Sequence, residues 1–468
     1  MTGRAAENGD SGGAEGSSGL AAGLVMRATL AAAAASFRFR VFHRSVVRTL
    51  GRRIGAALRH NSDDPDTLAN VEWFGAHLEA FFLRVVEERP LAARALLRFV
   101  ATYVRDVGRR RMSRRAGLPA LATVVVEPTD RCNLACPGCY AAAGDRPHDL
   151  PFETMVRVVD EAIGMGATLI TISGGEPFLR ERADGAVTRL AARFPGHGFL
   201  VYTNGTLIDD EVASRLGRLG NVFPAISVEG SEDDTDARRG SGVYEAGRSV
   251  RQRLAREGVM TGFSVTVTRE NADAVSTDAF LDRRIADGDL FGWFFLLQPI
   301  GRSPRLDLMV TARQRLGLRE AIQRWRRAGR PLFLGDFWND GALVGGCLAG
   351  GRYYFLVRAS GDVSPCVFAP VTCGNVSELG SPASEYSSLK DMVLRHPAFV
   401  RFRKEQARIR DRDVPCLLID HPEAFRRVAG LAECRPAGNM PAGYLDGAIA
   451  DALDGSAREF RRLVGGPS

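Results

Sequence analysis

Lysine is almost absent from this 468-residue chain: only Lys390 and Lys404 occur, so nearly all of its 62 basic residues are arginines. The chain also lacks an uninterrupted apolar run of membrane-spanning length, because Arg27 breaks the alanine-rich stretch Leu20–Ser36. The segment before that stretch is acidic rather than basic, which argues against a secretory signal peptide. No zinc-finger or RNA-recognition pattern occurs in the sequence, so nucleic acid is not an expected partner.

The positive charge is concentrated near the amino end. Residues Met1–Gly117 hold 19 Arg, no Lys and 11 acidic residues, hence 19 minus 11 or +8, whereas the whole chain is +7. Within this part, apolar and basic residues each recur every four positions on opposite sides of a helix. The apolar set is Phe42, Val46, Leu50, Ile54 and Leu58, and the basic set is Arg40, Arg44, Arg48 and Arg52. This pattern predicts a basic amphipathic helix, suited either to anionic lipid headgroups or to a structural helical cap on the next domain.

The eight cysteines fall into two groups, which favours metal ligation in a reducing compartment over disulfides. The first group, Cys132-x3-Cys136-x2-Cys139, follows the strand-like run Thr123–Glu127. Three thiolates on one short loop can hold three irons of a [4Fe-4S] cluster and leave the fourth iron open to a small molecule. A structural zinc site would need a fourth Cys or His, and the nearest histidine, His148, lies in a Pro/Asp loop.

Strand-like and helical runs alternate after this loop. Six strands alternating with helices predict an α/β fold with a parallel sheet, whose ligands bind at the carboxyl ends of the strands. The expected strands are Thr123–Glu127, Leu169–Ser173, Phe199–Tyr202, Val222–Val228, Gly262–Thr268 and Phe291–Ile300. Gly174, Gly175, Glu176, Asn204, Ser227 and Glu229 fall at or just after strand ends and are candidate site residues. A helix over Thr311–Ala328, opened by a Thr311-x-x-Gln314 capping box, is expected to close this domain.

The triple-cysteine loop, followed about forty residues later by Gly174-Gly175-Glu176, resembles the radical S-adenosylmethionine (radical SAM) superfamily. The resemblance implies a partial (β/α)6 TIM-type barrel. It also implies an enzyme whose open iron chelates SAM, which is cleaved to a 5'-deoxyadenosyl radical that takes hydrogen from an unactivated C–H bond. A reductant such as flavodoxin or ferredoxin would supply the electron.

The same resemblance implies roles for individual residues. Cys132, Cys136 and Cys139 would be the catalytic cluster ligands. The family usually has an aromatic residue just before the third cysteine, where this chain has Gly138, and Tyr140 is the expected substitute near the adenine. The implied cofactor-binding residues are Tyr140, Gly174, Gly175, Glu176, Asn204, Ser227, Glu229 and Arg239.

The second cysteine group has the pattern Cys347-x13-Gly361-x4-Cys366, followed by Cys373, Cys416 and Cys434. It resembles the SPASM or twitch auxiliary-cluster domains of radical SAM enzymes, and a hairpin around Gly361 would bring its first two thiols together. One auxiliary [4Fe-4S] cluster is expected, held by Cys347, Cys366, Cys416 and either Cys373 or Cys434. The remaining thiol would be an inert buried cysteine or a hydrogen-atom donor, and zinc is the alternative metal for this domain.

The predicted organisation is a disordered tail (1–19), a basic helical region (20–117), a radical SAM partial barrel (118–335), a small auxiliary iron-sulfur domain (336–440) and a C-terminal helix (441–468). Asp336, Tyr353 and His421 are further candidate pocket residues. A cytoplasmic location is expected, with peripheral membrane contact through the basic helix.

Three functions remain open at this point. The favoured one is hydrogen abstraction from a lipid-like or secondary-metabolite small molecule, because the amino end is basic and helical. The second is maturation of a ribosomally made peptide, and the third is an iron-sulfur electron carrier without SAM cleavage.

Overall fold

The computed structural model describes residues 65–88, 93, 96–97, 99–103, 110, 113, 120–141, 147–382 and 384–465, with side chains from residue 77 onward. The predicted tail (1–19) and the predicted amphipathic helix (40–58) lie outside the described residues. Among those that are described, no helix is long and apolar enough to cross a bilayer.

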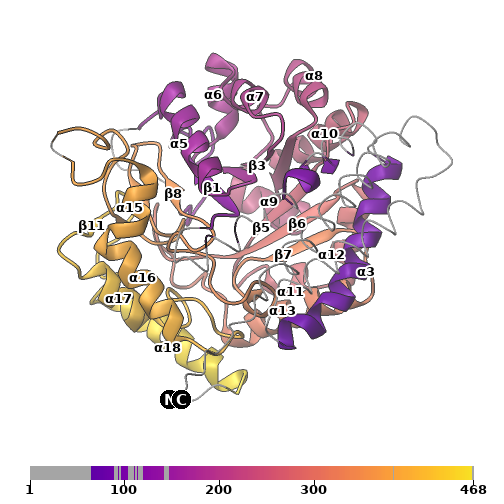
Figure 1. Ribbon diagram of the computed structural model, residues 1–468. Helices are drawn as coiled ribbons and strands as arrows, with labels where there is room; N and C mark the ends of the chain where they lie inside the picture. Colours follow the sequence, from indigo (N-terminus) through magenta and orange to yellow (C-terminus); the bar gives the residue numbers. More distant parts are fainter. Residues whose placement is uncertain are drawn as a thin grey trace, which may run out of the picture.

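A curved sheet with the strand order β7-β6-β5-β4-β3-β2-β1-β8-β9 forms the centre of the molecule (Figure 1). Neighbouring strands from β1 to β7 are all parallel. They are β1 (Thr123–Val126), β2 (Leu169–Ile172), β3 (Gly198–Thr203), β4 (Val222–Ser227), β5 (Gly262–Val267), β6 (Phe291–Leu296) and β7 (Phe333–Asp336). The α/β partial barrel inferred from the sequence is therefore confirmed, with β7 as an additional parallel strand after the six expected ones.

Helices connect successive strands and cover the outer face of the sheet (Figure 1). They are α5 (Phe152–Gly164), α6 (Pro177–Asp184), α7 (Ala186–Arg193), α8 (Asp210–Leu219), α9 (Glu232–Arg239), α10 (Val243–Arg256), α11 (Ala272–Val275), α12 (Asp278–Ala286) and α13 (Ala312–Arg327). The expected capping box is present, since Thr311 Oγ1 accepts from the Gln314 N–H at 3.2 Å and Gln314 Oε1 accepts from the Thr311 N–H at 3.1 Å. Gly185, at φ 68°, separates α6 from α7.

The opposite face of the sheet is covered near the amino ends of its strands by helix α3 (Pro65–Glu88). Phe81 and Phe82 of α3 pack in one apolar cluster with Phe223 and Phe291, which stand near the starts of β4 and β6. Arg84 secures this helix, because its guanidinium donates to the carbonyls of Asp289 at 2.8 Å and Ile285 at 2.9 Å. The described helix α3 of the N-terminal region thus packs against the barrel as a helical cap. It lies near the amino ends of the strands, whereas the polar candidate residues lie at the carboxyl ends.

The C-terminal region joins the same sheet. β8 (Leu356–Val357) pairs parallel with β1, and β9 (Val363–Ser364) pairs antiparallel with β8, as the hairpin expected around Gly361 requires. The remaining elements are α14 (Gly341–Val344), β10 (Val371–Thr372), α15 (Leu389–Arg395), α16 (Pro397–Arg408), α17 (Pro422–Ala429), β11 (Arg435–Pro436) and α18 (Ala448–Leu463). The second cysteine group is consequently held beside β1, the strand that leads into the first group.

Candidate functional site

The first triad, Cys132, Cys136 and Cys139, lies on the loop after β1 at the carboxyl edge of the sheet. Cys132 is exposed and the other two residues are half-buried. The Leu134 N–H donates to Cys132 Sγ at 3.4 Å. Partial desolvation of the sulfur, together with the charges of Glu176 and the other two thiols, raises the pKa of Cys132 to about 11. The three sulfurs are therefore close enough to influence one another.

Gly174 and Gly175 hold the start of this loop against the end of β2. The N–H groups of Gly175 and Glu176 donate to the carbonyls of Thr129 and Arg131 at 2.9 and 2.8 Å. A Cβ atom on Gly175 would lie 1.9 Å from the Arg131 carbonyl oxygen, and one on Gly174 would lie 2.4 Å from that of Thr129. Both glycines are thus required for backbone to approach backbone directly before Cys132.

Glu176 joins the ends of β2 and β3. Its Oε1 accepts from the Phe178 N–H at 3.1 Å and from Thr203 Oγ1 at 2.7 Å, and its Oε2 accepts from the Asn204 N–H at 2.8 Å. The residue is 1% exposed, and burial raises the pKa of its carboxyl against the opposing effect of these hydrogen bonds and of Arg239. The carboxyl is fixed in position beside the first triad.

Asn204 links the β3 end to the cysteine loop through a residue that sequence reasoning missed. Asn204 Nδ2 donates to Asn133 Oδ1 at 3.0 Å, and Asn133 Nδ2 donates to Thr206 Oγ1 at 2.9 Å. Thr206 completes the network by donating its N–H to Asn204 Oδ1 at 2.9 Å. The only sequence signal for Asn133 was an amide side chain directly after the first cysteine.

Glu229 and Arg239 form a buried ion pair near the same loop. Glu229 Oε1 accepts from Arg239 Nε and Arg238 Nη1, each at 2.7 Å. Arg239 also interacts with Cys136 and Cys139, which raise the pKa of its guanidinium although burial opposes this. Glu229 Oε2 is buried, and no hydrogen-bond partner for it exists among the described residues. Arg238 was not expected, since nothing distinguished it from other arginines in the sequence.

Ser227 and Tyr140, two of the predicted cofactor-binding residues, each contact another side chain of the protein. Ser227 Oγ lies 3.4 Å from Ser264 Oγ on the neighbouring strand β5. The Tyr140 ring packs against Phe368 with centroids 5.3 Å apart, which directs it toward the second cysteine group. Gly138, at φ 65°, supplies no aromatic contact, and Leu297 fills the adjoining space 3.1 Å from where its Cβ would be.

Glu127, the residue after β1, is another functional candidate that sequence reasoning missed. It is 3% exposed, and no partner for its Oε1 is found in the part of the chain that the structure describes. Burial raises the pKa of its carboxyl. The nearby Arg358 of the C-terminal region lowers this pKa, but by less than burial raises it. Burial raises the pKa of the Tyr140 hydroxyl, and the charge of Glu127 raises it further. The position of Glu127 at the end of the strand that leads into the cysteine loop was the available signal.

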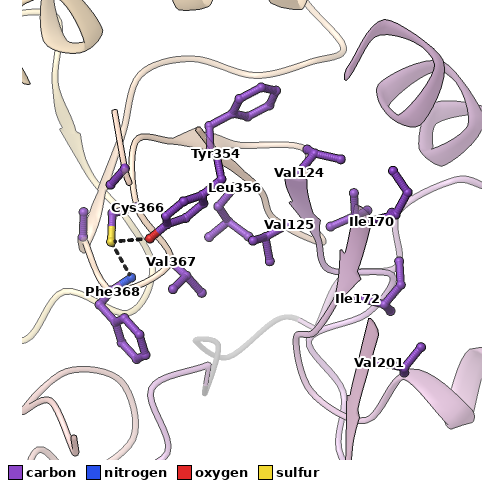
Figure 2. Close-up of a cluster of buried hydrophobic side chains, with 14 of the residues drawn as sticks. Val124, Val125, Ile170, Ile172, Val201, Tyr354, Leu356, Cys366, Val367 and Phe368 are labelled. Carbon is purple, nitrogen blue, oxygen red and sulfur yellow. Dashed lines mark hydrogen bonds between the residues drawn. The ribbon is translucent and has the colours of Figure 1, made fainter. Parts of the chain in front are cut away.

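The second triad, Cys347, Cys366 and Cys416, is more enclosed. The Tyr354 hydroxyl lies 3.0 Å from Cys366 Sγ, and the Phe368 N–H donates to the same sulfur at 3.4 Å (Figure 2). A hydrogen bond from Cys416 lowers the pKa of Cys347 to about 7, and burial raises that of Cys366 to about 12. The three predicted ligands are therefore neighbours.

An aspartate positions the third cysteine of this triad. Asp420 Oδ2 accepts from the Cys416 N–H at 2.9 Å, and its Oδ1 accepts from Arg315 Nη1 at 2.6 Å. Asp420 is fully buried. It stands next to His421, for which the sequence suggested a role, whereas His421 Nε2 contacts the Val414 carbonyl at 2.9 Å.

Cys373 and Cys434 pair with each other. Their thiols are hydrogen-bonded, and Cys434 Sγ also donates to the Val428 carbonyl at 3.2 Å. The side chains that act on Cys366 are instead Tyr354 and Cys347. That one of the two completes an auxiliary cluster stays a prediction. In the structure these two cysteines contact each other instead of the second triad.

The other candidates are engaged by the protein. Asp336 ends β7, and Asn339 Nδ2 donates to both of its oxygens at 3.0 and 2.9 Å. Burial and Asp340 raise the pKa of Asp336 to about 6. The Tyr353 carbonyl accepts from the N–H groups of Ala122 and Thr123 at the start of β1. His148 Nδ1 lies 2.9 Å from Asp130 Oδ2, so this histidine braces the loop segment before Cys132.

The donor chemistry of both triads suits iron-sulfur clusters, which are held by thiolates. Among the described residues, no three Cys, His, Asp or Glu side chains are gathered tightly enough to hold a single metal ion. Beside the first triad, Glu229 Oε2 and Glu127 Oε1 are buried acceptors for which the described residues provide no hydrogen-bond partner. A polar ligand carrying an ammonium group would satisfy such acceptors, so the residues present fit both a cluster and a zwitterionic cosubstrate.

Residues 126–280 match the family model described as Radical SAM superfamily. The chain is 32% identical over 285 residues to the mycofactocin maturase MftC of Mycolicibacterium smegmatis, which covers 57% of this chain and 70% of that protein. It is 28% identical over 267 residues to the sporulation killing factor maturation protein SkfB of Bacillus subtilis, which covers 54% of this chain and 63% of that protein.

The fold is also found among solved structures. The crystal structure of Streptococcus suis SuiB bound to S-adenosylmethionine superposes with a TM-score of 0.50 at 14% identity, covering 65% of this chain and 73% of that one. This likeness shows a shared fold.

Proposed function

Because this chain belongs to the radical SAM superfamily, we propose that it is the maturase of a ribosomally made peptide, acting on an unactivated C–H bond. It is an enzyme that uses a [4Fe-4S] cluster and SAM. The observation that carries the proposal is the gathering of Cys132, Glu176 and Arg239 at the carboxyl strand ends, with Cys132 exposed. The relatives named as a maturase and as a maturation protein support a peptide substrate.

Cys132, Cys136 and Cys139 are the proposed holders of the catalytic cluster. When bound, the cluster and SAM supply a 5'-deoxyadenosyl radical that removes a hydrogen atom from the substrate. The protein orients the loop rigidly, because Asn133 is tied to Asn204 and the backbone before Cys132 is bonded to Gly175 and Glu176.

Charged side chains around this loop are proposed to seat SAM. Arg239, already near the thiols, offers its guanidinium to a carboxylate, while Glu176 and Glu229 Oε2, which has no hydrogen-bond partner among the described residues, offer acceptors to an ammonium group. Their burial strengthens each of these interactions by excluding water. Asn204 and Ser227 remain proposed contacts for the rest of SAM, and Tyr140, whose ring packs against Phe368, remains the proposed contact for the adenine.

Cys347, Cys366 and Cys416 are the residues that would hold an auxiliary cluster, which when bound would supply electron-transfer chemistry. The Tyr354 hydroxyl contacts Cys366 Sγ, and Asp420 accepts from the backbone N–H of Cys416. Tyr354 and both of these cysteines are buried. Tyr140 and Phe368 lie in ring contact between the loop of the first triad and Cys366. This ring contact connects the two cysteine groups.

A peptide is favoured over the lipid-like substrate that the basic amino end suggested. The lipid reading depended on residues 40–58, which the structure does not describe, and the described N-terminal helix α3 packs against the barrel. Both maturation relatives, in contrast, align with more than half of this chain.

The test uses the anaerobically reconstituted full-length protein with SAM, dithionite and synthetic peptides matching the short reading frames beside its gene. We expect 5'-deoxyadenosine in the wild type, none above background in Cys132→Ser, and a mass change in one peptide. Deoxyadenosine formation that no peptide alters, together with modification of an added lipid extract, would contradict the peptide proposal. Absence of deoxyadenosine from protein with spectroscopically verified clusters would leave only the electron-carrier function.

A further inference from the structure

Two cysteines outside both triads are brought face to face by a short antiparallel ladder. β10 and β11 pair with Val371 opposite Pro436 and Thr372 opposite Arg435. The same register places Cys373 opposite Cys434 at the next position. These residues are far apart in sequence, and the contact between them is produced by the fold.

The position is of the type in which two strands approach most closely. The N–H of Cys373 donates to the Val363 carbonyl at 2.8 Å, and that of Cys434 donates to the Leu431 carbonyl at 3.0 Å, so neither N–H is used across the ladder. In an antiparallel pair of this kind the Cα atoms are about 4.5 Å apart. Disulfides span Cα separations of roughly 4.4–6.8 Å, so a bond requires little backbone movement.

We propose that Cys373 and Cys434 form a reversible disulfide and are a redox-sensitive dithiol distinct from the two cysteine triads, in place of the cluster-ligand role that the sequence suggested for one of them. Cys434 is half-buried whereas Cys373 is buried, so Cys434 is the thiol that an oxidant reaches first.

The reaction needs a disulfide oxidant such as oxidised glutathione. The Cys434 thiolate attacks one sulfur of the oxidant, forming a mixed disulfide and releasing one thiol. Cys373, after losing its proton, attacks Cys434 Sγ and releases the second thiol. The protein loses two electrons and two protons in forming the S–S bond. The oxidant takes up these two electrons and two protons and is reduced to two thiols.

The bond would connect to the first triad through a short segment. Five residues after Cys434, Asn439 donates its Nδ2 to the Tyr140 carbonyl at 2.9 Å and accepts from the Gly301 N–H at 2.9 Å. Arg302 in turn donates its N–H to the Cys139 carbonyl at 2.9 Å. A disulfide at Cys434 fixes the start of the segment that supports the end of the catalytic cysteine loop.

The test treats the cluster-loaded full-length protein anaerobically with oxidised glutathione, blocks free thiols and maps tryptic peptides by mass spectrometry. We expect peptides 359–390 and 428–458 to become linked, with fragmentation between Cys366 and Cys373 assigning the bond to Cys373. Dithiothreitol should restore both alkylated peptides. In Cys373→Ser, Cys434 should remain as a glutathione adduct, because the resolving thiol is gone.

Iron analysis separates this role from cluster ligation. Cys373→Ser and Cys434→Ser should keep the iron content of the wild type, whereas Cys416→Ser serves as the control expected to lose iron. Free thiols at both positions after oxidation, a link to Cys366 in place of Cys373, or loss of about one cluster's iron from either serine variant would overturn the proposal.

Discussion

The two cysteine triads are connected through the ring contact of Tyr140 with Phe368, and they differ in how far they are buried. The first, at Cys132, is partly exposed and is held by backbone contacts and amide side chains. In the second, Cys366 and Cys416 are buried, and Tyr354 contacts a sulfur directly. An exposed triad can admit a small molecule to an open iron, whereas an enclosed one is suited to passing electrons. The difference in exposure agrees with the proposed roles, SAM binding at the first triad and an auxiliary cluster at the second.

The largest expected effect comes from changing the exposed triad. Cys132→Ser should lower 5'-deoxyadenosine formation by more than about 100-fold, because removing a ligand exceeds the usual effect of its supporting groups. Since Cys132 is exposed, the midpoint of thermal unfolding of the metal-free protein should shift by no more than about 2 °C. The measurements are product formation by chromatography and unfolding by circular dichroism. A large loss of stability would show that this loop is part of the core.

The same substitution in the enclosed triad should give the reverse. Cys416→Ser should cost about 1–3 kcal/mol of unfolding free energy, as expected for a buried thiol whose backbone is fixed by Asp420. Uncoupled SAM cleavage should stay within about tenfold of the wild type, because the first triad is intact. Urea denaturation and deoxyadenosine assays measure the two quantities. Equal loss of SAM cleavage in both variants would remove the distinction between the triads.

Gly175 tests how the exposed triad is positioned. Gly175→Ala places a Cβ atom 1.9 Å from the Arg131 carbonyl, so the loop must shift at a cost of about 1–3 kcal/mol. We expect iron bound by the first triad and deoxyadenosine formation to fall by about tenfold or more. Gly317→Ala is the matched control, since nothing lies within 4 Å of its added Cβ in helix α13. A Gly175→Ala protein with normal iron and activity would mean that the loop adapts freely.

How much of the fold and of the candidate site the sequence could predict depends on how far apart in the sequence the interacting residues are. The strands and the first triad depend on local patterns: apolar runs such as Leu169–Ile172 and three cysteines within one loop. Partners that meet only through the fold were missed, including Asp420 at Cys416 and Asn133 at Asn204. No pattern in the sequence predicts which carboxylate will meet which buried N–H, because the register of distant segments decides it.

The pairing of Cys373 with Cys434 has the same origin. β10 and β11 are two residues long, too short for an alternating pattern, so the sequence could not show that they pair. The additional strand β7 escaped prediction for a related reason, since Phe333–Asp336 includes a glycine and an aspartate in four residues. The fold class survived these omissions because the longer strands determine the sheet.

Tyr354 tests the enclosed triad more gently. Tyr354→Phe removes the hydroxyl 3.0 Å from Cys366 Sγ and leaves the ring in place. A hydrogen bond to a cluster sulfur raises the reduction potential, so its loss should lower that of the auxiliary cluster by about 40 mV, the one-electron equivalent of roughly 1 kcal/mol. Potentiometric titration followed by electron paramagnetic resonance measures this. An unchanged potential, with the cluster present, would place the hydroxyl away from the iron ligand.

Glu127 lies between the two triads, and its substitution should have the smallest effect. It is near Tyr140 on one side and Arg358 on the other, and burial raises its carboxyl pKa above the usual 4.5. The folded protein then binds a proton more tightly than the unfolded chain, so this group's stabilisation is full below pH 4.5 and is lost as pH rises through the folded-state pKa. Glu127→Gln keeps the shape and removes the titration, so its unfolding free energy relative to the wild type should increase as the pH rises above 4.5. Urea denaturation of the metal-free proteins at several pH values measures the difference, with the exposed Glu270→Gln as control. If the difference stayed constant with pH, Glu127 would be ionised in both states, and the link between the triads would be an ion pair with Arg358 instead of a buried acid.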